Sequence, residues 1–126
     1  MFLPLECVED LCVLFYGPGF GGQYQQMAPD DVLALLEEDD FDGLIVDVRR
    51  HDEYASGHIP GALNVPNEDI QAGDVSLLPS LDQPLYVYCR TGRRSKEAAQ
   101  KLVDLGYENV MEFGGVVDWP GELVMD

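Results

Sequence analysis

The stretch Leu85-Tyr-Val-Tyr-Cys-Arg-Thr-Gly-Arg-Arg-Ser-Lys96 contains the features that decide the fold. A short apolar run ends at Cys89, a loop that contains Gly92 follows, and helix-favouring residues come next. This order places a thiol at the carboxyl end of a β-strand, in a loop whose backbone N–H groups lead into a helix N-terminus. Such a loop is suited to binding an anion. The stretch therefore predicts an α/β fold with Cys89 at its functional end.

The charge of this stretch is opposite to that of the chain as a whole. The 126 residues include 24 Asp and Glu against 7 Lys and Arg, a formal net charge of -17 at pH 7. Four of the seven cationic side chains follow Cys89 closely: Arg90, Arg93, Arg94 and Lys96. Positive charge and N–H donors favour thiolate over thiol, so Cys89 is predicted to be a nucleophile. The acidic balance argues against binding to nucleic acid or to an anionic membrane surface.

The cysteine count bears on compartment and on metal binding. The three cysteines, Cys7, Cys12 and Cys89, are an odd number without the spacing of a disulfide framework, which favours a reducing compartment. Cys7 and Cys12 are separated too widely for a zinc pair, and no matching Cys or His pair follows. We therefore expect neither a metal nor a cofactor.

The N-terminal segment, residues 1–22, differs in pattern from the rest of the chain. Apolar residues at helical spacing over 5–16 predict an amphipathic helix, and Gly17-Pro-Gly-Phe-Gly-Gly22 is typical of a linker. The segment carries acidic residues and no Lys or Arg, which makes it a poor signal peptide, and its apolar run is too short to span a bilayer. We expect a single compact domain over 23–126 in a cytoplasmic protein.

Alternating apolar runs and helix signals predict the other elements. The run 44–48 is nearly all apolar, as in a parallel strand buried on both faces. A helix is expected to begin at Pro29, and Gly106 is expected to end a helix that begins near Arg93. Further expectations are a short helix over 52–56, a brief helical turn at most within 75–81, strands over 62–65, 85–88 and 110–113, and a final turn opening at Gly114-Gly115. The class is α/β, with a mainly parallel central sheet flanked by helices.

Three stretches together resemble the rhodanese-like (sulfurtransferase) domain family, over about residues 24–119. Leu44-Ile-Val-Asp-Val-Arg-Arg-His-Asp-Glu-Tyr54 followed by Gly57-His-Ile-Pro-Gly-Ala62 is similar to the family's first signature. Tyr88-Cys-Arg-Thr-Gly-Arg-Arg-Ser95 is similar to its active-site loop. The family's C-terminal end is similar to three short stretches of this chain: Gly106-Tyr107, Asn109-Val110 and Gly114-Gly-Val-Val-Asp-Trp119. The resemblance implies a rhodanese-like three-layer sandwich in its single-domain form.

The resemblance also implies sulfur transfer through Cys89. A sulfane-sulfur donor such as thiosulfate would give its outer sulfur to the thiolate, forming a persulfide, and a thiophilic acceptor would remove it. The implied partners are a small anionic sulfur donor and a thiol or protein-thiol acceptor, with the protein a monomer or a weak homodimer. The donor and the sulfite leaving group are anions, which suits the neighbouring arginines.

The predicted site is the loop itself, with Cys89 as the catalytic residue. The residues predicted to bind substrate are Arg90, Thr91, Gly92, Arg93, Arg94 and Ser95. Arg94 has a second reading, in which it pairs with an acid and braces the loop. Thr91 and Ser95 either donate hydroxyls to the sulfur or cap the following helix. Gly92 is expected to adopt a positive φ that lets the loop N–H groups converge.

Other polar residues near the loop are predicted to be structural. Asp47 and Arg49 are expected to form a polar pair in the framework. His58 is expected to be a hydrogen-bonded turn residue, because sulfur transfer needs no general base once the thiolate exists. Glu53 and Tyr54 are expected to be packing and surface residues of the short helix, and Trp119 is expected to be a core anchor.

Two other functions stay open at this point. The first is a sulfur-carrier or regulatory module that binds one protein partner and turns over free thiosulfate poorly. Separately, Cys7 and Cys12 could accept sulfur from Cys89 or form a resolving disulfide with it, although packing roles are favoured. The second is a phosphatase or arsenate reductase, which is disfavoured by loop length. Cysteine phosphatases place five residues between cysteine and arginine, whereas four residues separate Cys89 from Arg94.

Overall fold

The computed structural model describes residues 23–125, which form a parallel β-sheet with helices on both faces. The strands are β1 (Gln25–Gln26), β2 (Leu44–Asp47), β3 (Leu63–Asn64), β4 (Leu85–Cys89) and β5 (Val110–Gly115). The helices are α1 (Pro29–Leu36), α2 (His51–Ser56), α3 (Asn67–Gln71) and α4 (Arg93–Asp104), followed by a 3₁₀ turn, η1 (Val116–Asp118). The expectations for residues 1–22, including the amphipathic helix and the roles of Cys7 and Cys12, lie outside the described residues.

The sheet places β4 at its centre. The strand order is β1-β5-β4-β2-β3, and all four strand pairs are parallel. Because β4 has a neighbour on each side and helices above and below, its residues are almost entirely apolar and buried, as expected for a central parallel strand. Cys89 is the last residue of this strand, so the thiol lies at the carboxyl edge of the sheet, where open α/β sheets place their sites.

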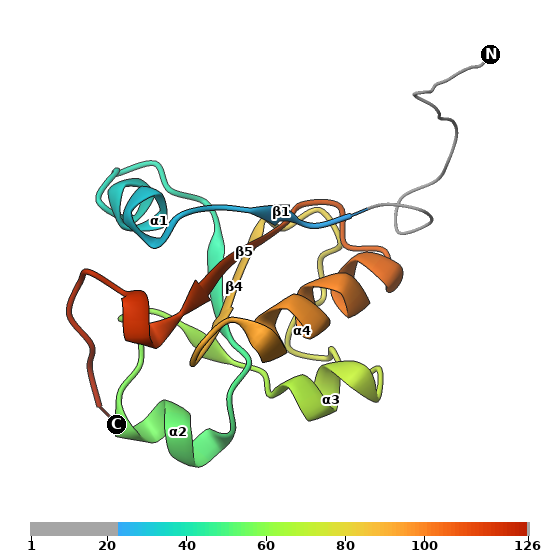
Figure 1. The fold of residues 1–126 in the computed structure, drawn as a ribbon. Coiled ribbons are helices and arrows are strands. Elements are labelled where there is room, and N and C mark those ends of the chain that lie inside the picture. Colours follow the sequence, from blue (N-terminus) through green and yellow to red (C-terminus); the bar gives the residue numbers. More distant parts are fainter. Residues whose placement is uncertain (1–22, 126) are drawn as a thin grey trace.

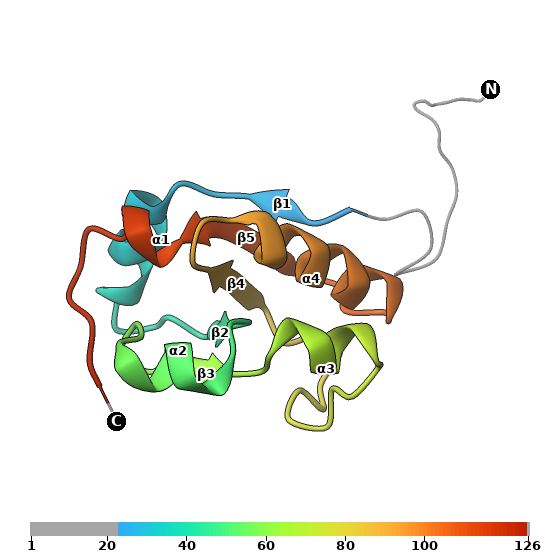
Figure 2. The same cartoon turned by 60° about the horizontal axis from the view of Figure 1, so that its bottom comes forward.

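Two apolar clusters fill the two faces of the sheet. Buried residues of α4, with Ile70 of α3, pack with the β4 residues Leu85 and Val87 on one face. On the other face, Val32 of α1 packs with Phe113 of β5 and with the half-buried Trp119. Figures 1 and 2 show α3 and α4 on the side of the sheet opposite α1. The α/β sandwich predicted from the sequence is therefore confirmed.

Local signals explain where the longer helices begin and end. Pro29 is in the first turn of α1 and is followed by two acidic residues, which suits the positive end of the helix dipole. Helix α4 ends at Asp104, and Gly106 follows with φ +107, a left-handed conformation that a glycine adopts without strain. Both boundaries agree with the sequence to within two residues.

Three details of the structure were not predicted. The segment 75–81 contains no more than turns, in agreement with the sequence, but the helix α3 before it was not expected; Pro66 precedes α3 and acidic residues occupy its first turn. Gly114 and Gly115 belong to β5, which extends two residues beyond the expected strand. The two-residue β1 was not expected, because a strand so short shows no periodicity; it is defined by its pairing with Met111 and Glu112. None of the helices in the described part of the chain is long and apolar enough to cross a bilayer.

Candidate functional site

Cys89 is held at the start of a tight loop between β4 and α4. The residue is 1 % exposed, and its sulfur accepts a hydrogen bond from the Gly92 backbone N–H at 3.0 Å. Gly92 is the residue before the first turn of α4, and its φ is +108, so the expected positive φ is confirmed. A side chain at this position would be strained, which makes glycine the residue that lets the chain turn back over the sulfur. The helix N-terminus and the Gly92 N–H both favour negative charge on Cys89.

The floor of the loop is the Gly114-Gly115 backbone of β5. The pairing register of β5 with β4 shifts by one residue between Val87 and Cys89, so that Cys89 lies opposite Gly115. Gly114 adopts φ +93 at this irregularity, as glycines do at β-bulges. A Cβ atom on Gly115 would overlap the Arg90 carbonyl oxygen and approach the Thr91 nitrogen to 2.6 Å. The loop can pack this closely only because no side chain is present there.

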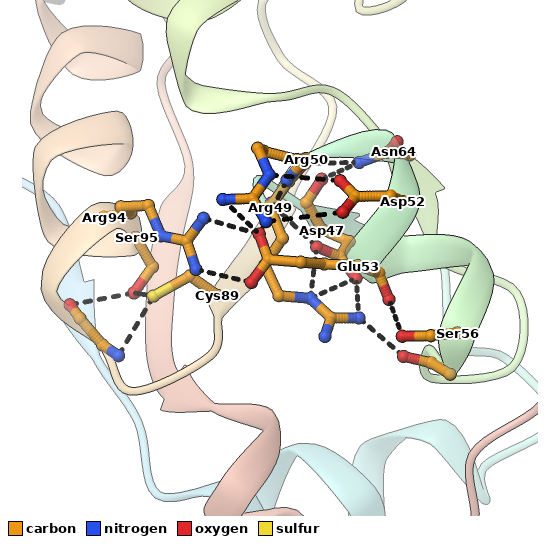
Figure 3. A network of polar contacts seen from close by, with 12 residues as sticks. Asp47, Arg49, Arg50, Asp52, Glu53, Ser56, Asn64, Cys89, Arg94 and Ser95 are labelled. Atoms are coloured by element: carbon orange, nitrogen blue, oxygen red, sulfur yellow. Dashed lines mark hydrogen bonds and ion pairs between the residues drawn. The ribbon is translucent and has the colours of Figure 1, made fainter.

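Arg94 is paired with an acid on helix α2. Its guanidinium donates to both carboxylate oxygens of Glu53, at 2.8 and 3.1 Å, and Figure 3 shows Arg94 turned toward α2. Glu53 also accepts the Arg50 backbone N–H at 3.1 Å. The Arg94 hydrogen bonds, aided by this N–H, lower the pKa of Glu53 to about 2. Of the two alternatives for Arg94, the geometry therefore supports the one in which it pairs with an acid and braces the loop.

Glu53 was expected to have only a packing or surface role, but it is the partner that holds Arg94. The pKa of Arg94 is raised, first by its hydrogen bonds to Glu53 and more weakly by negative charge on Cys89. Arg94 therefore lies within electrostatic range of the sulfur while both of its bonded nitrogens face α2. The ion pair joins two motifs that are 41 residues apart in the sequence.

The other two arginines of the loop face solvent. Arg90 and Thr91 are exposed, and the side chain of Arg93 is 82 % exposed, with a long contact of 3.9 Å to Glu97 as its only ion pair among residues 23–125. Exposed pairs of this length contribute little to stability, so Arg93 is available to an incoming anion. The structure thus divides the predicted residues into two exposed cations at the rim, Arg90 and Arg93, and one cation held beneath it.

Ser95 lies beneath the sulfur and is fully buried. The Cys89 thiol donates to Ser95 Oγ at 3.5 Å, and Ser95 Oγ donates to the Glu112 carboxylate at 2.6 Å. Ser95 is three residues beyond the cap position, and no side chain caps α4. The capping alternative is therefore wrong for Ser95, whose hydroxyl lies between Cys89 and Glu112. Glu112 was not singled out from the sequence, although a single acid inside a buried apolar strand was a signal.

A second polar cluster supports β4 from the neighbouring strand. Arg49 donates to both carboxylate oxygens of Asp47, and the Tyr88 hydroxyl donates to Asp47 Oδ2 at 2.7 Å. Asp47 is completely buried, and burial, together with the Asp47 charge, raises the pKa of Tyr88. The expected framework pair of Asp47 and Arg49 is confirmed. Figure 3 shows Asp47 and Arg49 between α2 and the Cys89 loop.

Two further residues have the expected structural surroundings. His58 is buried, with Nδ1 at 2.9 Å from the Tyr54 carbonyl oxygen, and its ring stacks on that of Tyr54 with centroids 3.7 Å apart. Trp119 packs against Phe113, with ring centroids 5.7 Å apart. Within residues 23–125, no group of three or more His, Cys, Asp and Glu side chains is arranged to hold a metal ion.

The chain is similar to known proteins over most of residues 23–125. The sequence profile of the rhodanese-like domain family matches residues 28–122. Thiosulfate sulfurtransferase GlpE of Pseudomonas entomophila is 35% identical over 105 residues, covering 79% of this chain and 92% of that protein. A putative sulfur carrier protein of Bacillus subtilis, YrkF, is 33% identical over 79 residues, covering 62% of this chain and 42% of that protein. The solution NMR structure of a rhodanese-like domain from Anabaena superposes with a TM-score of 0.72 at 28% identity, covering 82% of this chain and 81% of that one.

Proposed function

Because the chain belongs to the rhodanese-like domain family and is a rhodanese-type sulfurtransferase, we propose that it moves sulfane sulfur from a donor such as thiosulfate through a Cys89 persulfide. The observation that carries this proposal is the environment of the Cys89 sulfur. It lies at the carboxyl end of the central strand, accepts the Gly92 N–H and faces the start of α4. A thiolate in this position is stabilised and can attack sulfur.

The first half-reaction loads the cysteine. The Cys89 thiolate attacks the outer sulfur of thiosulfate, a new S–S bond forms, and the S–S bond of thiosulfate breaks with its electron pair leaving on sulfite. The charge balances, because one thiolate and one dianion give one persulfide anion and one dianion. The exposed cations Arg90 and Arg93 attract the donor and stabilise the departing sulfite. The Gly92 N–H is positioned to stabilise negative charge at the sulfur.

The second half-reaction unloads it. A thiophilic acceptor attacks the outer sulfur of the persulfide, and the Cys89 thiolate leaves. Two successive displacements on one residue give ping-pong kinetics. The acceptor class we propose is a thiol or protein thiol, with cyanide as an assay substitute, and the setting is a reducing compartment such as the cytoplasm.

A sulfur-carrier role is the second candidate, and two observations favour it. The similar Bacillus protein is named a putative sulfur carrier. The Cys89 residue is only 1 % exposed, so an acceptor that fits the rim would reach the sulfur better than a freely diffusing thiol. Under this alternative the loaded protein turns over free thiosulfate slowly and transfers sulfur rapidly to one protein. Phosphatase chemistry has less support, because the loop is one residue shorter and Arg94 is engaged by Glu53.

Intact-protein mass after brief exposure to thiosulfate, and again after cyanide, tests the proposal. We expect a gain of about 32 Da, one sulfur atom, that cyanide removes. Cys89→Ser should abolish the gain, and a Cys7→Ser/Cys12→Ser variant should keep it. A gain retained in Cys89→Ser would refute Cys89 as the sulfur acceptor. No gain in the unmodified protein, with Cys89 still open to alkylation, would refute thiosulfate as the donor.

A further inference from the structure

A buried carboxylate beneath the reactive loop has no role in the steps above. Glu112 is 1 % exposed on β5, and none of the ion pairs formed by residues 23–125 involves it. Its oxygens instead accept three hydrogen bonds: from Gln26 Nε2 at 3.1 Å, from Gly114 N at 2.9 Å and from Ser95 Oγ at 2.6 Å. A buried carboxylate without a cation is costly, so its presence next to the nucleophile calls for a physical reason.

The hydrogen bonds run in one direction, from the sulfur to this carboxylate. Ser95 has a single hydroxyl proton, and its shortest contact is with Glu112 Oε2, a charged acceptor, rather than with the Gly92 carbonyl at 3.0 Å. With that proton committed to Glu112, the oxygen is free to accept the Cys89 S–H at 3.5 Å. Sulfur, hydroxyl and carboxylate thus form a continuous donor–acceptor chain.

Electrostatics make the two ends of this chain depend on each other. Cys89 and Glu112 are both buried, and two negative charges joined through one hydroxyl repel each other strongly where water is excluded. The thiolate is therefore disfavoured if the thiol proton goes to solvent while Glu112 stays ionised. Moving that proton to Glu112 leaves the cluster with one negative charge before and after. A proton that stays within the cluster therefore avoids a second buried negative charge.

We propose that Glu112 is a positioning residue that takes up the Cys89 proton through Ser95, so that the reactive thiolate forms without a second buried negative charge. This inference rests on the proposed role of Cys89 as the nucleophile. The S–H proton passes to Ser95 Oγ while the Ser95 proton passes to Glu112 Oε2. The products are a thiolate, an intact hydroxyl that now donates to it, and a neutral carboxyl group. The persulfide anion that follows then lies above an uncharged acid.

The other charged groups near Cys89 and Glu112 are directed elsewhere or exposed, so the proton exchange is confined to these two residues and Ser95. From α4, Arg94 is directed to Glu53, and from β1 the neighbour is the neutral Gln26. The β4 tyrosines, Tyr86 and Tyr88, pack with the opposite face of the sheet, where α1 also lies. The remaining charged side chains of α4 are exposed or half-buried: Arg93, Lys96, Glu97, Lys101 and Asp104.

The test is the pH dependence of Cys89 alkylation in the full-length protein. Iodoacetamide is uncharged and needs no sulfur donor, and the tryptic peptide that ends at Arg90 contains only this cysteine. In the unmodified protein we expect the rate to change less than about threefold between pH 5.5 and 7.5, because the pair keeps one proton throughout. In Glu112→Gln the thiol ionises alone, so the rate should fall about tenfold for each pH unit below its midpoint.

Glu112→Gln preserves the shape of the side chain. The new amide oxygen can accept hydrogen bonds from Ser95 and Gly114, and the new amide nitrogen can donate to Gln26 once the Gln26 amide is flipped. Ser95→Ala interrupts the chain at its centre and should remove the plateau in the same way. Asp47→Asn is the matched control: it changes another fully buried carboxylate and should keep the plateau. If the alkylation rate depends on pH in the same way in the unmodified protein, in Glu112→Gln and in Ser95→Ala, the inference is overturned. If the pH profiles differ but thiosulfate adds no sulfur to the protein, thiosulfate is refuted as the donor while the proton transfer to Glu112 is supported.

Discussion

The ion pair between Glu53 and Arg94 gives a sharp prediction, because it joins helix α2 to the loop between β4 and α4. Both side chains are mostly buried, with 17% of Glu53 and 25% of Arg94 exposed, and the geometry is bidentate. Glu53→Gln keeps the size of the side chain and removes its charge. We expect the variant to fold and to be less stable than the unmodified protein at neutral pH. In acid the unmodified protein also loses the contribution of this ion pair, so the difference in stability between the two proteins should shrink.

The magnitude follows from the pKa of Glu53. Its ordinary value of 4.5 falls to about 2 in the folded protein, and at 1.36 kcal/mol per unit this sets a ceiling of about 3 kcal/mol. Solvent screening of a partly exposed pair reduces the expected loss to about 1–2 kcal/mol. Because the folded pKa lies below the unfolded one, this contribution is fully present above about pH 4.5 and is lost as pH falls through about 2.

Urea unfolding followed by circular dichroism at pH 7 and pH 3 measures this difference. Glu53→Gln should lower the free energy of unfolding by about 1–2 kcal/mol at pH 7 and by less than half as much at pH 3. An equal loss at both pH values would refute the assignment of the pKa shift to this pair. Arg94→Met is the companion variant. If Arg94 only braces the loop, the two variants should slow sulfur loading equally; a much larger effect of Arg94→Met would indicate contact with the donor.

Three further predictions concern the rim, the floor and the frame of the site. Arg93→Ala should raise the thiosulfate KM several-fold and change stability by less than about 0.5 kcal/mol, because the side chain is exposed; unchanged kinetics in a steady-state assay would count against the anion role. Gly115→Ala should destabilise the protein by about 1–3 kcal/mol and slow loading, since its methyl group displaces the Arg90 carbonyl; thermal unfolding and loading rates check both. Tyr88→Phe should cost about 1–3 kcal/mol in urea unfolding, because the buried Ile59 N–H loses its acceptor; a neutral result would contradict the hydrogen bond.

The features that the sequence predicts well are those with short-range signals. The buried run before Cys89, Pro29 at a helix start and Gly106 after a helix end all depend on neighbours within a few residues. The loop residues also follow from one contiguous stretch, and so does the positive φ of Gly92. The elements missed, β1 and α3, are both short. A two-residue strand such as β1 exists because β5 offers it a partner, which local periodicity cannot register.

The residues that position the loop could not be assigned from sequence, because each depends on register between distant segments. Glu53 belongs to a motif that was recognised, yet nothing local shows that it meets Arg94. Glu112 is flanked by apolar residues, and a register shift of one residue would turn it to the opposite face of the sheet. In the observed register it lies opposite Val87, on the face covered by α4, where it accepts a hydrogen bond from Ser95.

The charged residues of the site fall into two groups with different roles. The cations proposed to meet an anionic donor, Arg90 and Arg93, are exposed and come directly from the loop. The acids that shape the loop, Glu53 and Glu112, come from α2 and β5 and act on Arg94 and Ser95. An acid beside a thiolate would oppose its formation unless its charge is neutralised. Arg94 does this for Glu53, and the thiol proton does it for Glu112, so the two acids can lie close to the sulfur without suppressing its reactivity.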